Sequence, residues 1–358
     1  MEKKILTILA AIIVLTVLVA GGALYWLELS KTQPAVSQKN TRTITDALGR
    51  QVQIPVNPQR VVTTYPPLTT EVYMLAPDKL VGWQTKPSGK YMKAQYANLP
   101  VVGGWYGLWT GKYEEFLVQK PDLILVNADV GLATIDEHQK RFAPVPIVAV
   151  NDTTNELKLE PTIRFMGDIL NENDQADKLI SFYHRVQQDV EKRVSNVPAD
   201  TGRRVYYAEG PKGLSTDPKG ADHTQLIEIT HGHNVADVQM KPGYGMTPVS
   251  MENVLQWNPE VIIVENAAFY QSVYNDTLWQ EIPAVKNHRV YYMPHDPFPW
   301  FDRPPGVSCI IGFPWTLNVI YPELATDMDL KGYVREFYST FYHYDLTDAE
   351  LEKILASG

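Results

Sequence analysis

The sequence predicts an α/β fold of two similar lobes joined by one long helix, behind an N-terminal transmembrane helix. The first observation is an internal repeat: in both Glu114–Val126 and Glu252–Val264, a helical turn precedes proline, an acidic residue and a hydrophobic strand. The second is the alternation of strand-like and helical segments, which is typical of a parallel sheet. The third is a long apolar run near the N-terminus. A repeated module creates a cleft between its copies, and we expect the function there.

The N-terminal residues predict a membrane anchor. Lys3 and Lys4 precede Ile5–Leu27, a run without charged residues that would span roughly 35 Å as a helix. This length crosses a bilayer, and the lysines favour an extracellular location for all that follows. A cleaved signal peptide is the alternative, although its apolar region would be shorter. We therefore expect a single-pass cell-membrane protein anchored by residues 1–28, with residues 29–42 as a polar linker.

Length and composition exclude several classes of protein. The chain has 358 residues, enough for two domains with cores of their own, and its hydrophobic fraction of 44% is that of a globular protein. A net charge of -9 without a basic stripe argues against a nucleic-acid partner. The single cysteine, Cys309, excludes an intramolecular disulfide framework and a cysteine zinc cluster.

The first lobe is expected over residues 43–160. Its opening segment, Thr43–Pro55, has the pattern of a small hairpin that turns at Leu48-Gly49. Parallel strands then follow, separated by helical stretches. These strands are expected at Arg60–Thr64, Lys79–Trp83, Asp122–Val126 and Ile147–Val150.

A helical link over residues 161–198 is expected to connect the lobes. Pro161 starts it, Asn173 or Asp174 caps it again, and apolar residues at helical spacing continue to about Val194. Because a helix bends less easily than a pair of strands, we expect the lobes to move little. The second lobe is expected over residues 199–358, with strands at Arg204–Ala208, Glu260–Val264 and Arg289–Met293.

Several segments resemble the substrate-binding proteins of ABC importers that carry iron-siderophores, haem, cobalamin and, in some branches, molybdate or tungstate. The resemblance runs from about Thr43 to Glu323. It implies two Rossmann-like lobes with the ligand between them, at the carboxyl ends of the strands. The family's anchoring cysteine is absent here. The matching segments are Ile44–Pro55, Pro58–Val62, Pro67–Glu71, Leu226–Ala236 and Pro299–Gly306.

Arg303 is a candidate ligand-binding residue. It stands in the run Trp300-Phe301-Asp302-Arg303-Pro304-Pro305, where the two prolines stiffen the backbone. An arginine fork suits a carboxylate or an oxyanion such as molybdate, because both offer paired acceptor oxygens. The alternative is an internal ion pair with Asp302 or another acid.

Aromatic residues are dense in the loops expected at the cleft. Flat rings give a large contact area at little torsional cost, which suits a planar macrocycle or an aryl siderophore. Burial in the core is the alternative for any single ring. Trp105 falls where the resemblance places a tryptophan of the cobalamin-binding relative, and Trp300 stands near Arg303. The expected aromatic ligand-binding residues are Tyr65, Trp83, Trp105, Tyr106, Tyr207 and Trp300.

His223 opens a helix in a loop of the second lobe that is expected to face the cleft. There it could ligate a metal or donate to an oxyanion. No histidine pair has the spacing that places two imidazoles on one helical face, so we expect no metal site built by the protein alone and no resident cofactor. A metal would arrive within its own complex.

Glu71 and Glu228 lie on the helices expected after the first strand of each lobe. The resemblance implies that these are surface carboxylates, one on each lobe, that dock on arginines of the importer's permease. The alternative is a solvated helix charge. Exposed charge pairs chiefly steer and align partners.

The sequence therefore predicts a monomeric, extracellular, membrane-anchored substrate-binding protein that works with an ABC permease and its ATPase. It is not expected to be an enzyme. An iron complex, siderophore or haem-like, is the favoured ligand, and molybdate, tungstate or cobalamin is the alternative. A membrane-anchored metallohydrolase is the alternative from another class, but the sequence has no nucleophile elbow, phosphate-binding loop or dinucleotide fingerprint to support one.

Overall fold

The computed structural model describes residues 40–106, 110–151, 154–198, 201–241 and 245–356. The predicted transmembrane segment Ile5–Leu27 and nearly all of the linker lie outside this range. Among the described residues, no helix combines the length and the apolar character needed to cross a membrane.

The described chain opens with the predicted hairpin. Strands β1 (Thr41–Thr45) and β2 (Gln51–Pro55) pair with each other. Gly49 turns between them with a φ of +75°, a backbone conformation that residues with side chains seldom adopt.

The N-terminal lobe holds a parallel sheet in the order β3-β4-β5, which are Val61–Thr63, Leu123–Asn127 and Ile147–Val150. The prediction of a strand at Lys79–Trp83 is wrong. This segment forms only single bridges, Leu80 with Val61 and Trp83 with Val101, because it passes from one neighbour to the other within a few residues. The helices of this lobe are α2 (Pro66–Leu75), α3 (Ala94–Ala97), α4 (Tyr113–Val118) and α5 (Gly131–Phe142), with short 3-10 turns η2 (Pro77–Lys79) and η3 (Ala128–Val130).

The predicted helical link is two helices, α6 (Glu160–Leu170) and α7 (Asn173–Val194). Asn171 separates them in the left-handed conformation, which ends a helix readily at asparagine. Along α7, the buried side chains recur at the spacing of one helical face: Ala176, Leu179, Ile180, Phe182, Tyr183, Val186, Val190 and Val194.

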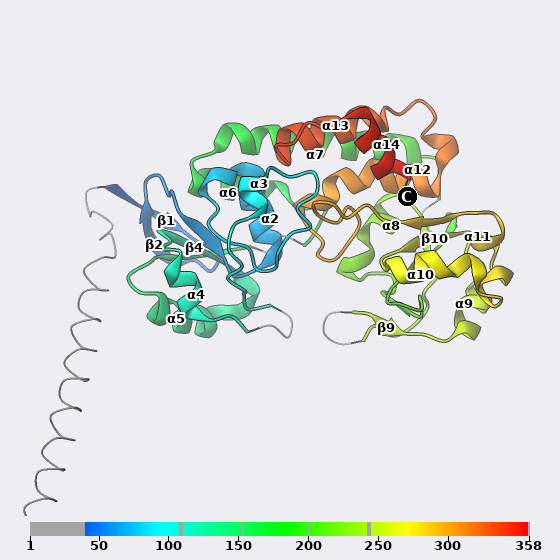
Figure 1. Cartoon of the computed structure of the whole chain (residues 1–358), viewed down its shortest axis with the longest axis horizontal. Helices are drawn as coiled ribbons and strands as arrows, with labels where there is room; N and C mark the ends of the chain where they lie inside the picture. The colour runs from blue at the N-terminus through cyan, green and yellow to red at the C-terminus, as the bar shows by residue number, and fades with distance from the viewer. Residues whose placement is uncertain (1–39, 107–109, 152–153, 199–200, 242–244, 357–358) are drawn as a thin grey trace, which may run out of the picture. The chain divides into compact units, whose positions relative to one another are not determined.

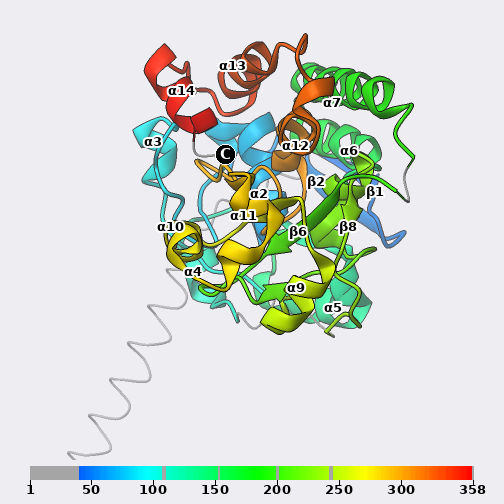
Figure 2. The same ribbon diagram turned by 90° about the vertical axis from the view of Figure 1, so that its right-hand side faces the viewer.

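The C-terminal lobe contains a second parallel sheet in the order β11-β10-β6-β8. Its strands are β6 (Arg204–Ala208), β8 (His233–Asn234), β10 (Val261–Val264) and β11 (Val290–Tyr292), and Figure 2 shows β6 beside β8. A small antiparallel ribbon pairs β7 (Ser215–Thr216) with β9 (Thr247–Pro248).

The C-terminal half of the chain also contains helices and short 3-10 turns. The helices are α8 (Gln225–Ile229), α9 (Met251–Trp257), α10 (Ala267–Ser272), α11 (Pro283–Lys286), α12 (Gly312–Ile320), α13 (Leu330–Phe341) and α14 (Asp348–Ala356). The 3-10 turns are η4 (Asp222–Thr224), η5 (Val273–Asn275), η6 (Trp279–Glu281), η7 (Val307–Ile311) and η8 (Pro322–Leu324).

The two sheets are separate, as the repeat predicts, but their helical layers share one apolar core. Figure 1 shows α13 beside α7, where the rings of Phe182 and Phe337 lie 5.3 Å apart. The end of α13 also reaches the first lobe, because the Tyr73 hydroxyl donates to the Tyr342 carbonyl at 2.6 Å. The C-terminal helices therefore pack against the first lobe, in addition to the helical link that joins the lobes along the chain.

Candidate functional site

The strand order of the C-terminal sheet predicts where a ligand would bind. From β6 the chain passes to β8 on one side, and from β10 it passes to β11 on the other. In open α/β sheets, ligands bind at the carboxyl ends of the strands where successive connections diverge in this way. Glu209 directly follows β6 and Glu265 directly follows β10, so both side chains begin at that edge.

Arg303 is held at this edge by buried acids. Its Nε donates to Glu209 Oε1 at 2.6 Å, and its Nη2 donates to Asp217 Oδ2 at 2.8 Å. Asp302 Oδ2 lies 3.5 Å from the same Nε. The backbone of Arg303 has a φ of +62°, which is unusual for a residue with a side chain. The internal ion pair that the sequence left open is therefore present, and it involves three carboxylates.

His223 is oriented by Asp302. Its Nδ1 lies 2.6 Å from Asp302 Oδ1, and the buried Tyr207 hydroxyl donates to Asp302 Oδ2 at 2.9 Å. Burial alone would lower the pKa of His223, but its hydrogen bond and ion pair with Asp302 outweigh burial and raise the pKa above the usual value. The imidazole is thus stabilised in its protonated form.

Glu209 Oε1 and Asp217 Oδ2 converge on one nitrogen, because both accept from Nη2 of Arg303. Glu209 Oε2 is buried and has no hydrogen-bond partner among the described residues. Burial raises the pKa of Glu209 to about 9, although the Arg303 guanidinium opposes this shift. Burial also raises the pKa of Asp217. Two buried carboxyl groups that converge on one nitrogen repel each other when both are ionised, so a proton shared between them is favoured.

The cationic side chains of this cluster are the ones that face solvent. The side chains of His223 and Arg303 are each 20% exposed, whereas those of Glu209, Asp217 and Asp302 are 0% exposed. A molecule that arrives from solvent therefore meets an imidazole and a guanidinium first, with the carboxylates behind them.

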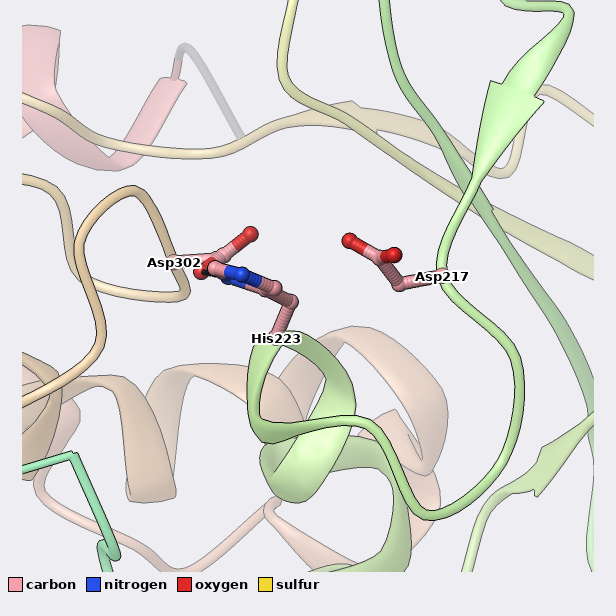
Figure 3. A group of neighbouring side chains, drawn as sticks. All are labelled: Asp217, His223 and Asp302. Carbon is pink, nitrogen blue, oxygen red and sulfur yellow. Dashed lines mark hydrogen bonds and ion pairs between the residues drawn. The ribbon is translucent and has the colours of Figure 1, made fainter. Parts of the chain in front are cut away.

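Three members of the cluster are close enough to be tested as a metal site. Asp217, His223 and Asp302 offer one atom each, all within 4.8 Å of one another (Figure 3). Both carboxylates are fully buried and already accept hydrogen bonds, Asp217 from Met246 N and Asp302 from Tyr207. Arg303 already forms ion pairs with both acids. A metal ion would have to displace this internal cation, so the residues do not fit a resident metal.

Three predicted aromatic residues gather at the other lobe. Trp105 N donates to the carbonyl of Thr64, the residue that follows β3, and Tyr65 precedes α2. Tyr65, Trp105 and Tyr106 are all partly exposed. The Trp105 ring also packs at 4.8 Å from Tyr113, so part of it belongs to the core.

The two other predicted tryptophans lie in the core. Trp83 is 3% exposed and donates from Nε1 to the Tyr96 carbonyl at 2.8 Å. Trp300 is 0% exposed. Neither side chain offers a ring face to a ligand, because neighbouring core residues already cover it, and we leave both out of the proposed site.

The predicted surface position of Glu71 is wrong. Its side chain is fully buried on α2, because every residue from Pro67 to Leu75 is buried in this helix. Burial raises the pKa of Glu71 to about 8, and neither carboxyl oxygen has a hydrogen-bond partner among the described residues. Glu228 is half-buried, and its Oε1 accepts a hydrogen bond from Gly220 N at 2.6 Å.

Sequence reasoning missed Glu209 and Asp217. A local signal was present, because each acid directly follows a short strand, β6 or β7. Their convergence on Arg303 has no local signal, because it depends on how β6, β7 and the loop after β11 come together.

Two α/β lobes, with a polar cluster at the carboxyl edge of one sheet, are typical of proteins that bind a solute. The chain is a member of the periplasmic binding protein family, whose model matches residues 61–297. Members of this family are solute-binding proteins of ABC transporters and not enzymes, so the chain is the substrate-binding component of such a transporter.

Particular relatives cover most of the chain. The molybdate-binding protein MolA of Haemophilus influenzae is 28% identical over 84% of this chain and 91% of its own length. An uncharacterized ABC transporter substrate-binding lipoprotein, YvrC of Bacillus subtilis, is 26% identical over 78% of this chain and 86% of its own length. The structure of an ABC transporter solute binding protein from Sulfurospirillum deleyianum matches with a TM-score of 0.78 and 26% identity, over 87% of this chain and 98% of that one.

Proposed function

We propose that this chain captures a tetrahedral oxyanion of the molybdate or tungstate class and delivers it to an ABC permease. One observation carries the proposal: His223 and Arg303 are the partly exposed members of a cluster whose carboxylates are fully buried. Imidazolium and guanidinium N–H groups match the acceptor oxygens of an oxyanion. The buried acids orient these donors and do not compete for solvent-side contacts. The relative named as molybdate-binding supports the same ligand class.

An iron complex, which the sequence favoured, is the second candidate. It is supported by the partly exposed rings of Tyr65, Trp105 and Tyr106, which could pack against an organic chelator, a haem-like macrocycle or cobalamin. In that case the metal arrives wrapped in its own complex, and Arg303 binds a carboxylate of the chelator.

The N-terminal apolar run supports a membrane-anchored protein whose bulk is extracellular. Ile5–Leu27 is long enough to serve as the anchor, and the substrate-binding lipoprotein among the relatives is consistent with attachment at the membrane. We propose that the exposed part works as a monomer.

Docking on the permease needs accessible carboxylates on both lobes. Glu114 and Glu252 satisfy this condition: the internal repeat aligns them, each lies in the first turn of its helix, α4 or α9, and both are exposed. We propose this pair for docking in place of Glu71, which is buried. Glu228 remains a further candidate.

A thermal-shift experiment on the purified protein tests the ligand class. The probes are molybdate, tungstate, sulfate, a ferric siderophore, haem and cobalamin. A ligand present at a hundred times its Kd stabilises the folded state by about 2.7 kcal/mol, which is a measurable shift in Tm. Shifts with molybdate and tungstate support the oxyanion proposal. A shift with an iron complex alone favours the second candidate, and no shift with any probe contradicts both.

A further inference from the structure

We propose that Glu209 is a positioning residue that shares one proton with Asp217, and that the oxyanion binds together with this proton. The inference rests on the proposed oxyanion function and deepens it, because it makes a proton the second ligand of the site. It starts from two buried carboxyl groups that converge on the Arg303 guanidinium, and whose role the ligand contacts alone do not explain.

The surroundings of Glu209 favour a proton on or near its carboxyl group. Its Oε1 accepts from Arg303, whereas its Oε2 is buried without a hydrogen-bond partner among the described residues. Asp217 Oδ2 accepts from Nη2 of Arg303, the same nitrogen that donates to Glu209 Oε1. Two buried carboxylates that converge on one nitrogen repel each other when both are ionised, which favours one proton shared between them.

Charged and titratable groups from several neighbouring elements interact with Glu209. Arg303 and Asp302 face it from the loop before η7, and Asp217 faces it from the end of β7. Tyr206 and Tyr207 of β6 interact electrostatically with Glu209, and both also have a raised pKa, chiefly through burial. His223 adds a cation close to Asp217. The cluster thus contains three carboxyl groups and two cationic side chains.

A bound dianion makes the net charge of the cluster more negative. If Glu209 were ionised, it would hold the Arg303 guanidinium as a full counter-charge and oppose a ligand on its other side. With Glu209 protonated, Arg303 keeps its orientation through the same hydrogen bonds but retains net positive charge for the oxyanion. Burial already favours the neutral acid, since the pKa of Glu209 is raised to about 9. The structure therefore couples anion affinity to this single proton.

Calorimetric titration of the purified full-length protein with sodium molybdate tests the coupling. Titrations run from about pH 7 to about pH 10, each in two buffers of different ionisation enthalpy, so that proton uptake is measured directly. For the wild type we expect affinity to fall by up to roughly tenfold per pH unit above the pKa of Glu209, the slope of a one-proton linkage. Proton uptake should rise over the same interval. His223 contributes its own dependence, which every variant that keeps His223 shares.

Glu209→Gln is the decisive variant. The amide keeps a neutral group of the same shape, so molybdate should still bind at pH 7. Above about pH 9 the part of the affinity loss and of the proton uptake that Glu209 contributes should disappear, and only the dependence due to His223 should remain. Glu265→Gln is the matched control, because Glu265 follows β10 as Glu209 follows β6 and accepts a backbone bond from Gly210 N. This control should keep the wild-type pH profile.

The outcomes separate the two proposals. A wild-type pH slope and proton uptake in Glu209→Gln would overturn the shared proton while leaving the oxyanion function intact. If Glu209→Gln does not fold, Asp217→Asn removes the other partner, and an unchanged slope in that variant overturns the inference equally. If the wild type binds no molybdate at any pH, the proposed oxyanion function itself fails, and this inference fails with it.

Discussion

Asp302 fixes the ring of His223: the carboxylate is fully buried, and its Oδ1 lies 2.6 Å from the imidazole Nδ1. The Tyr207 hydroxyl holds the second oxygen of the same carboxylate. This chain of contacts leaves the opposite side of the imidazole for the solvent side of the site. Asp302 therefore fixes the orientation of the His223 ring at the edge of the sheet.

Asp302→Asn should weaken molybdate binding about tenfold, because the amide no longer stabilises an imidazolium as a carboxylate does. The raised pKa of His223 should fall toward its ordinary value. A group with a raised pKa in the folded state stabilises the fold fully below its unfolded pKa, and this stabilisation is lost as pH rises through the folded pKa. The variant should therefore lose stability mainly on the acid side of the His223 titration. An NMR titration of the histidines and urea unfolding at several pH values measure both effects, with Tyr207→Phe as the control that keeps the carboxylate.

Arg303→Ala should weaken ligand binding tenfold or more, roughly the loss of a charged bidentate contact. It should also cost about 3–5 kcal/mol of stability, because removing one partner leaves buried carboxylates unpaired. Arg303→Lys keeps a charge but not the fork, and should retain part of the stability and little of the affinity. Calorimetry and denaturant unfolding measure the two quantities. Unchanged ligand affinity in the alanine variant would remove Arg303 from the ligand site.

Glu71→Gln should make the protein more stable at alkaline pH. Burial raises the pKa of Glu71 to about 8, so the folded state holds a proton that the unfolded state releases above its ordinary pKa of 4.5. The wild type therefore loses stability as pH rises from about 4.5 to about 8. The difference should be on the order of a few kcal/mol above pH 8 and small near pH 5. Urea unfolding at both pH values checks this, with the exposed Glu115→Gln as control; an equal effect at both values would contradict the buried titration.

Glu114→Arg combined with Glu252→Arg should abolish uptake while ligand affinity stays intact. Both carboxylates are exposed, so the changes should leave the core undisturbed and reverse only the charge that meets the permease. Transport in cells and calorimetry on the purified protein separate the two effects. Glu115→Arg is the matched control, because Glu115 is exposed on the same helix but aligns with Asn253 in the repeat. Normal uptake in the double variant would refute this docking pair.

The secondary structure was largely predictable because its signals are local. The β6, β10 and β11 runs alternate with helices, and their hydrophobic residues were sufficient to place them. The hydrophobic run Lys79–Trp83 predicts a strand, but no continuous strand forms because its pairing partner changes within the run. The two-residue strands β7, β8 and β9 carry too few residues for any periodic pattern.

The sequence by itself determined the doubled α/β module and the helical link, and it singled out Arg303 and His223 as candidates, because repeats, periodicity and residue chemistry are written along the chain. Only the tertiary structure decided that Glu71 and Trp300 are buried, since burial depends on which helices and loops pack around a residue. It also decided that Arg303 meets Glu209 and Asp217, residues far from it in sequence. Parallel strands bring their carboxyl ends to one edge whatever the sequence distance between them, and that edge assembled the acids behind the two cations.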